Sequence, residues 1–160
     1  MVEPPDNPSP GPASEQSDRV PDAIGCSPVE STIQTATRAA VASAARCRSL
    51  RLLVLHGSRA RNDAQARSDW DFAYLGDVGL DALALRADLA SALRTDALDL
   101  AGLDRAGALL RFRVARDGVA VFEREEDCFP RFWIDATQFW CDMGPIIRKG
   151  GEALLASFEK

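Results

Sequence analysis

Side chains of the kinds that bind phosphate and metal ions lie close together in residues 53–74. Gly57 and Ser58 follow an apolar run, and Asp69 and Asp71 come after a spacer of ten residues. Alternate side chains of a strand point the same way, so Asp69 and Asp71 are expected to project together. Two neighbouring carboxylates repel each other unless a cation lies between them, and carboxylate oxygens suit Mg²⁺. The spacing therefore predicts a metal site.

The Gly-Ser pair predicts a phosphate site beside that metal. Gly57 has no Cβ, so a phosphate and the backbone can approach closely there. Ser58 offers a hydroxyl and a backbone N–H at the start of a short helix expected over 58–65. The guanidinium fork of Arg61 suits phosphate oxygens, and Arg59 and Arg67 flank the same place. The ordinary alternative for these arginines is solvent-facing charge on a short helix.

Alternating helices and strands predict an α/β (α+β) fold, a single domain with a small mixed sheet and helices packed on it. Strands are expected over 50–55, 70–75, 96–100 and 119–122. Helices are expected over 27–47, 81–94, 104–115 and 125–160, the last with a break at Gly144-Pro145. Large apolar side chains gather between Phe129 and Ile147, where they either cover the sheet or form a partner surface.

Two of these helices have recognisable ends and faces. Ser27, Pro28 and Glu30 form a capping box, and Asp81 is a cap for the helix over 81–94. The second helix presents its leucines at positions 85, 89 and 93 on one face. The first helix has a thin apolar face, so we expect it to lie on the sheet. That face is made of Ile33, Ala36, Ala40, Val41 and Ala44.

Asp99 is the third candidate acid. It stands between Leu98 and Leu100 in an expected strand, where burial of an unpaired carboxylate would be costly. A metal shared with Asp69 and Asp71 would compensate its charge. An exposed position on an edge strand is the alternative.

The apolar strand, Gly-Ser, spacer and Asp-x-Asp together resemble the nucleotidyltransferases of the DNA polymerase beta type. The pieces Gly-Ser-Arg-Ala-Arg (57–61) and Ser-Asp-Trp-Asp-Phe (68–72) are similar to the minimal members, the MNT antitoxins of HEPN/MNT toxin-antitoxin pairs. The resemblance covers about residues 27–123. Asn62 stands where the family commonly has Gly, and Gly102 where members often carry another Asp.

The resemblance implies an enzyme that transfers AMP from ATP to a hydroxyl group, a tyrosine of a HEPN ribonuclease toxin, and so silences the toxin. Two Mg²⁺ ions would be held by Asp69, Asp71 and Asp99, while Gly57, Ser58 and Arg61 bind the nucleotide. Asp99 could also receive the proton of the acceptor hydroxyl.

Two other functions fit the same residues. A small-molecule nucleotidyltransferase of the aminoglycoside kind is one, although such enzymes generally need a second domain to shape the acceptor pocket. A catalytically inactive antitoxin that acts by binding is the other. The presence of Ser58 and all three aspartates argues against it.

Composition sets the outer bounds. The chain has 160 residues and a net charge of −5, which suits one domain and disfavours a nucleic-acid partner. Four scattered cysteines and one histidine cannot form a Cys/His zinc cluster. We expect a Pro-rich disordered tail over 1–26, a nucleotidyltransferase domain over 27–124 and a helical extension of that domain over 125–160. With no signal peptide and no apolar run long enough to span a membrane, the expected location is the cytoplasm.

Overall fold

The computed structural model describes residues 28–65 and 68–158, and the surroundings of individual side chains for residues 35–65 and 68–151. The predicted tail over 1–26, the capping Ser27, Cys26 and Arg67 lie outside the described residues. No helix in the described part is long and apolar enough to cross a membrane.

Four strands form one mixed sheet in the order β3-β2-β1-β4. They are β1 (Leu50–His56), β2 (Trp70–Gly76), β3 (Leu98–Gly102) and β4 (Val119–Glu123). β1 runs antiparallel to β2 and β4, whereas β2 and β3 are parallel. The parallel pair needs a crossover, which is supplied by α3 (Ala82–Leu93). The predicted mixed sheet is confirmed.

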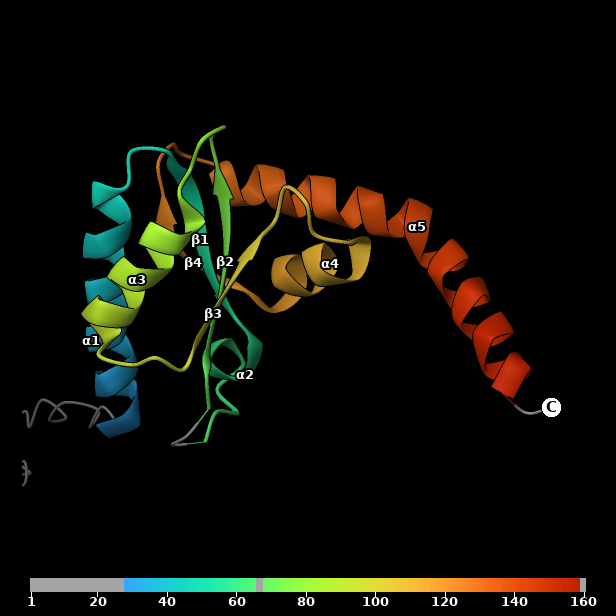
Figure 1. Cartoon of the computed structure of the whole chain (residues 1–160), viewed down its shortest axis with the longest axis horizontal. Helices are drawn as coiled ribbons and strands as arrows, with labels where there is room; N and C mark the ends of the chain where they lie inside the picture. The colour runs from blue at the N-terminus through green and yellow to red at the C-terminus, as the bar shows by residue number, and fades with distance from the viewer. Residues whose placement is uncertain (1–27, 66–67, 159–160) are drawn as a thin grey trace, which may run out of the picture.

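Helices cover both faces of this sheet (Figure 1). α1 (Pro28–Arg46) lies beside α3 on one face, and α4 (Ala108–Asp117) lies beside α5 (Cys128–Phe158) on the other. The one-turn helix α2 (Gly57–Ala60) directly follows β1. The sheet is therefore the middle layer of three.

Strand alternation divides the core into two clusters, one on each face. The α1/α3 side receives Leu53 and Leu55 of β1 with Trp70 and Phe72 of β2, and the α4/α5 side receives Leu52, Val54 and Ala73. A fully buried leucine or phenylalanine side chain contributes about 1.5–3 kcal/mol to stability. Phe132 of α5 is buried, while Trp133 and Ile134 are exposed, so the apolar residues of α5 both cover the sheet and face outward.

The predicted cap of α3 is confirmed, and the predicted helix faces largely agree with the structure. Asp81 caps α3 by accepting hydrogen bonds from the N–H groups of Leu83 and Ala84, each at 3.0 Å. Leu85 and Leu89 are buried beneath it. On α1, Ala40 and Ala44 are buried and Ala36 is partly buried, but Val41 is 36% exposed and lies outside the core.

The end of α2 and the starts of β3 and α4 differ from the prediction. α2 stops at Ala60 because Asn62 has a φ of +59°, which ends an α-helix. β3 begins at Leu98, two residues later than expected. The Arg86 guanidinium donates hydrogen bonds to the carbonyls of Asp96 and Leu98 at the start of this strand. α4 starts at Ala108, after an extended Gly107.

The predicted break at Gly144-Pro145 is wrong. α5 is continuous from Cys128 to Phe158, with Pro145 inside it, and Figure 1 shows it changing direction along its length. Gly144 is buried, and a Cβ built on it would lie 3.3 Å from the ring of Trp140.

Candidate functional site

The site lies where the end of β1 meets the beginnings of β2 and β3. His56 is paired with Asp71 across β1 and β2, and Asp71 is paired with Asp99 across β2 and β3. Paired residues of neighbouring strands project to the same face. The topology therefore brings Asp71 and Asp99 side by side, as the sequence predicts, on the face covered by α4.

Gly57 supports the carboxylate of Asp71 directly. The φ of Gly57 is +72°, and a Cβ built on it would lie 2.0 Å from Oδ2 of Asp71. No side chain can occupy that space, so only glycine leaves the carboxylate where it is. In the structure the Asp71 carboxylate occupies this space, and the approach of a phosphate to Gly57 stays a prediction.

Asp69 comes immediately before β2 and is exposed. Arg59 holds its backbone: the Nε of Arg59 donates to the Asp69 carbonyl at 3.1 Å, and Nη2 donates to the carbonyl of Ser68. The Arg59 guanidinium also lies 4.3 Å from the ring centroid of Trp70. These contacts make Arg59 a clamp on the loop before β2, a different use from the phosphate contact or solvent-facing charge considered from the sequence.

Asp99 is exposed on an edge strand, so the argument from the cost of burial is wrong. Its place beside Asp71 is what connects it to the site. Among the described residues, no three Asp, Glu, His or Cys side chains are close enough to form a ready metal cluster. Mg²⁺ is commonly held by one or two carboxylates with waters and phosphate oxygens, so a preformed cage is not required.

His56 is partly buried beside these acids. Burial lowers the pKa of His56 below its usual value of 6.5, and the charges of Asp71 and Asp99 oppose that shift. The imidazole is therefore neutral at pH 7. The sequence analysis leaves His56 out of the chemistry, and none of its contacts requires a role there.

Ser58 and Arg61 both lie close to Gly57. Ser58 is half-buried in α2, and its carbonyl accepts a hydrogen bond from the N–H of Asp63. Arg61 Nε pairs with Oδ2 of Asp63 at 3.1 Å, with both side chains about half exposed. Asn62, where the family commonly has Gly, adopts the left-handed conformation that Gly or Asn tolerates best.

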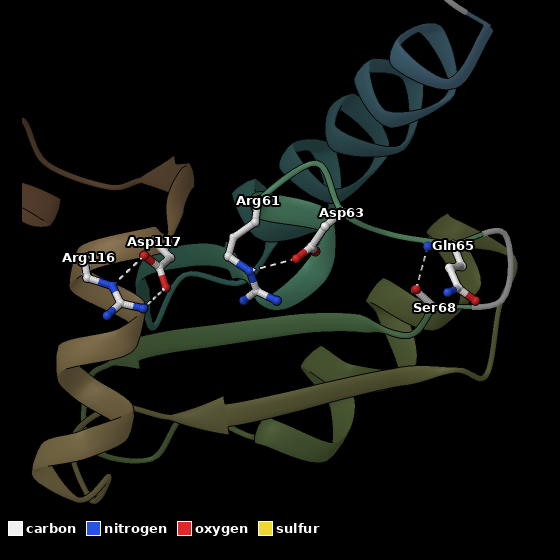
Figure 2. A network of polar contacts seen from close by, with 6 residues as sticks. All are labelled: Arg61, Asp63, Gln65, Ser68, Arg116 and Asp117. Carbon is white, nitrogen blue, oxygen red and sulfur yellow. Dashed lines mark hydrogen bonds and ion pairs between the residues drawn. The ribbon is translucent and has the colours of Figure 1, made fainter.

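A cavity of about 500 Å³ opens between α2 and α4. Its walls include Gly57, Arg61 and Asp71 on one side and Arg113, Arg116 and Asp117 of α4 on the other, with His56 and Leu110 completing the lining. Figure 2 shows Arg61 beside the Arg116–Asp117 pair.

The α4 residues were missed by the sequence analysis. Arg113 and Arg116 are spaced to share one helix face, which is the only local signal they carry. Nothing in the local sequence shows that this face meets the Gly-Ser turn, because the two segments come together only through the order of the strands.

Comparisons with known proteins identify the family and the fold. The family model described as polymerase beta, nucleotidyltransferase, matches residues 42–127. The protein adenylyltransferase MntA of Aphanizomenon flos-aquae is 34% identical over 95 residues, which are 52% of this chain and 63% of that relative. The match thus spans less than two thirds of the relative's length.

Two solved structures share the fold. A crystal structure of a toxin-antitoxin with AMP-PNP superposes with a TM-score of 0.60 at 23% identity, covering 78% of this chain and 98% of the matched chain. A tri-AMPylated HEPN toxin in complex with an MNT antitoxin, from Shewanella oneidensis, gives a TM-score of 0.57 at 23% identity, covering 79% and 98%.

Proposed function

The chain belongs to the polymerase beta nucleotidyltransferase family, and from this we propose that it transfers AMP from ATP to a tyrosine hydroxyl of a HEPN ribonuclease toxin, acting in the cytoplasm as the antitoxin. The observation that carries the proposal is the contact of Gly57 with Asp71, next to Asp99, at the end of β1. It places carboxylates beside the cavity-lining turn that leads from β1 into α2. Nucleotidyl transfer needs both features, the first to hold metal ions and the second to admit phosphate.

The names of the relatives support the acceptor and the nucleotide. The matched MntA is called a protein adenylyltransferase, and the similar solved structures contain AMP-PNP in one case and an AMPylated HEPN toxin in another. An ATP-dependent transfer to a toxin protein is the reaction these names have in common.

Asp69, Asp71 and Asp99 would hold two Mg²⁺ ions. When bound, such ions would neutralise phosphate charge and lower the barrier to displacement at phosphorus. The donor set fits, because all three side chains supply the hard oxygen ligands that Mg²⁺ prefers.

The chain's own residues would orient the reactants. Ser58 and Arg61 bind the phosphates, and Asp99 receives the proton of the acceptor hydroxyl. The acceptor oxygen bonds to the α-phosphorus, the bond from that phosphorus to pyrophosphate breaks, and AMP stays on the acceptor. Holding these groups in line accounts for much of the expected rate enhancement.

The test is AMP transfer from labelled ATP, in the presence of Mg²⁺, to a HEPN protein encoded beside this chain. We expect the wild type to label the toxin and Asp69→Ala to lose the label. The matched control is Asp88→Ala, which removes an exposed aspartate from α3, away from the site.

Other outcomes would contradict the proposal or indicate a different function. A toxin that stays unlabelled with the wild type contradicts the catalytic proposal. Label on an aminoglycoside but not on the toxin would indicate the small-molecule enzyme. A toxin silenced without label, equally well by Asp69→Ala, would indicate an antitoxin that acts by binding.

A further inference from the structure

The α4 wall of the cavity carries two arginines in different electrostatic states. Arg116 is neutralised by its neighbour: Nε and Nη2 donate to the two oxygens of Asp117 at 2.7 Å and 2.6 Å. Arg113 lines the same cavity and its charge also acts on Asp117, but no side-chain hydrogen bond or ion pair with another described residue holds its guanidinium. Arg113 is therefore the α4 cation whose donors are available to a ligand.

The opposite wall supplies a second cation. Arg61 uses Nε for Asp63, which leaves its two terminal nitrogens as further donors. The cavity thus has a guanidinium on each side, with Gly57 and Asp71 at its edge. Its volume of about 500 Å³ falls in the range of small-molecule sites.

We propose that Arg113 is a further phosphate-binding residue, which binds the β- and γ-phosphates of the nucleotide from the α4 side of the cavity, opposite Arg61. The inference rests on the proposed function, since Asp71 fixes where the reacting α-phosphate lies. From there the two distal phosphates extend between α2 and α4. Guanidinium forks give bidentate contacts to phosphate oxygens, and Arg113 is the group the sequence analysis did not assign.

Asp117 has a separate part in this arrangement. By holding both donors of the Arg116 fork, it keeps that arginine beside α4.

The proposal predicts how affinity depends on phosphate number. Loss of one charge-assisted contact weakens binding by about ten- to a hundredfold. We expect Arg113→Gln to weaken the binding of ATP and of inorganic pyrophosphate by this factor and to leave the affinity for AMP unchanged. Arg113→Lys keeps the charge but not the fork, so its affinity for ATP should fall between that of the wild type and that of Arg113→Gln.

Calorimetric titration of the chain with ATP, pyrophosphate and AMP, with Mg²⁺ and without toxin, measures these affinities. The matched control is Arg105→Gln, which removes an exposed arginine beyond the other end of β3. Thermal melting of each variant reports folding.

The proposal is overturned if pyrophosphate does not compete with ATP for the wild-type protein, or if Arg113→Gln binds ATP as tightly as the wild type does. It is also overturned if Arg113→Gln weakens the binding of AMP as much as that of ATP. Its failure is separable from that of the proposed function. A chain that binds ATP through Arg113 but labels no toxin refutes AMP transfer alone, and a chain that labels toxin with unchanged affinity in Arg113→Gln refutes the arginine assignment alone.

Discussion

Gly57 and Asp71 form a contact in which neither residue can be exchanged freely. Gly57 has a positive φ, and its missing side chain is the space that the Asp71 carboxylate fills. The left-handed backbone alone costs a non-glycine residue about 1–3 kcal/mol. The position of the carboxylate is therefore set by backbone geometry rather than by a hydrogen bond.

Gly57→Ala tests this contact. The new methyl group would displace the Asp71 carboxylate, and a displacement of about 1 Å can lower a rate by roughly a hundredfold. We therefore expect the rate of AMP transfer to fall by roughly a hundredfold. The free energy of unfolding, measured in urea, should fall by about 1–3 kcal/mol. Gly79→Ala is the control, because Gly79 also has a positive φ but no atom lies within 4 Å of its added Cβ. It should lose stability and keep activity; equal activity in both variants would refute the contact's role.

Single residues were predictable where the chemistry is local. Asp71 and Gly57 follow from strand alternation and a turn, which are properties of neighbouring residues. Asp99 was chosen for the wrong reason, since its exposure on an edge strand removes the cost that was invoked. Arg113 could not be found, because its relation to Gly57 depends on the packing of α4 against α2.

At the scale of elements, α5 continues through a residue that locally predicts a break. A proline removes one backbone hydrogen bond and crowds the carbonyl four residues before it, at a cost of about 3 kcal/mol. The helix nevertheless continues through Pro145. The strands were easier to predict, because apolar runs bounded by turns fix them, whereas the ends of α2 and α4 depend on the conformations of Asn62 and Gly107.

Pro145→Ala should strengthen α5 at this point. It restores an N–H donor for the carbonyl of Cys141, so amides near residue 145 should exchange with deuterium more slowly. Pro130→Ala is the matched control, since Pro130 lies in the first turn of α5, where an N–H has no acceptor within the helix. If the two substitutions slow amide exchange equally, Pro145 does not weaken α5 locally.

For the whole molecule, the part of α5 that packs on the sheet belongs to the core, whereas its residues 145–151 do not. Cys128, Phe132 and Ala136 are buried against β1 and α4. Residues 145–151 are all exposed. We propose on these grounds that residues 125–160 extend the domain formed by residues 27–124.

Truncation distinguishes the two parts of α5. A chain ending at residue 144 should melt within a few degrees of the full chain, because it keeps every residue of α5 that the structure describes as buried. A chain ending at residue 127 loses a cluster in which each large side chain is worth about 1.5–3 kcal/mol, against a usual total of about 5–15 kcal/mol. It should show no cooperative transition by circular dichroism. A cooperative melt of this shorter chain would show that α5 is dispensable.

The cavity between α2 and α4 also has a consequence for biosynthesis. Its two walls, at residues 56–71 and 110–117, leave the ribosome at different times, and the strand order that unites them requires β3 to be in place. Domains fold during synthesis from the N-terminus onward. A nascent chain that has exposed its carboxylates still lacks half of the cavity, so ligand capture would begin only after α4 docks. A ligand held by both walls would then stabilise the finished fold over every earlier intermediate.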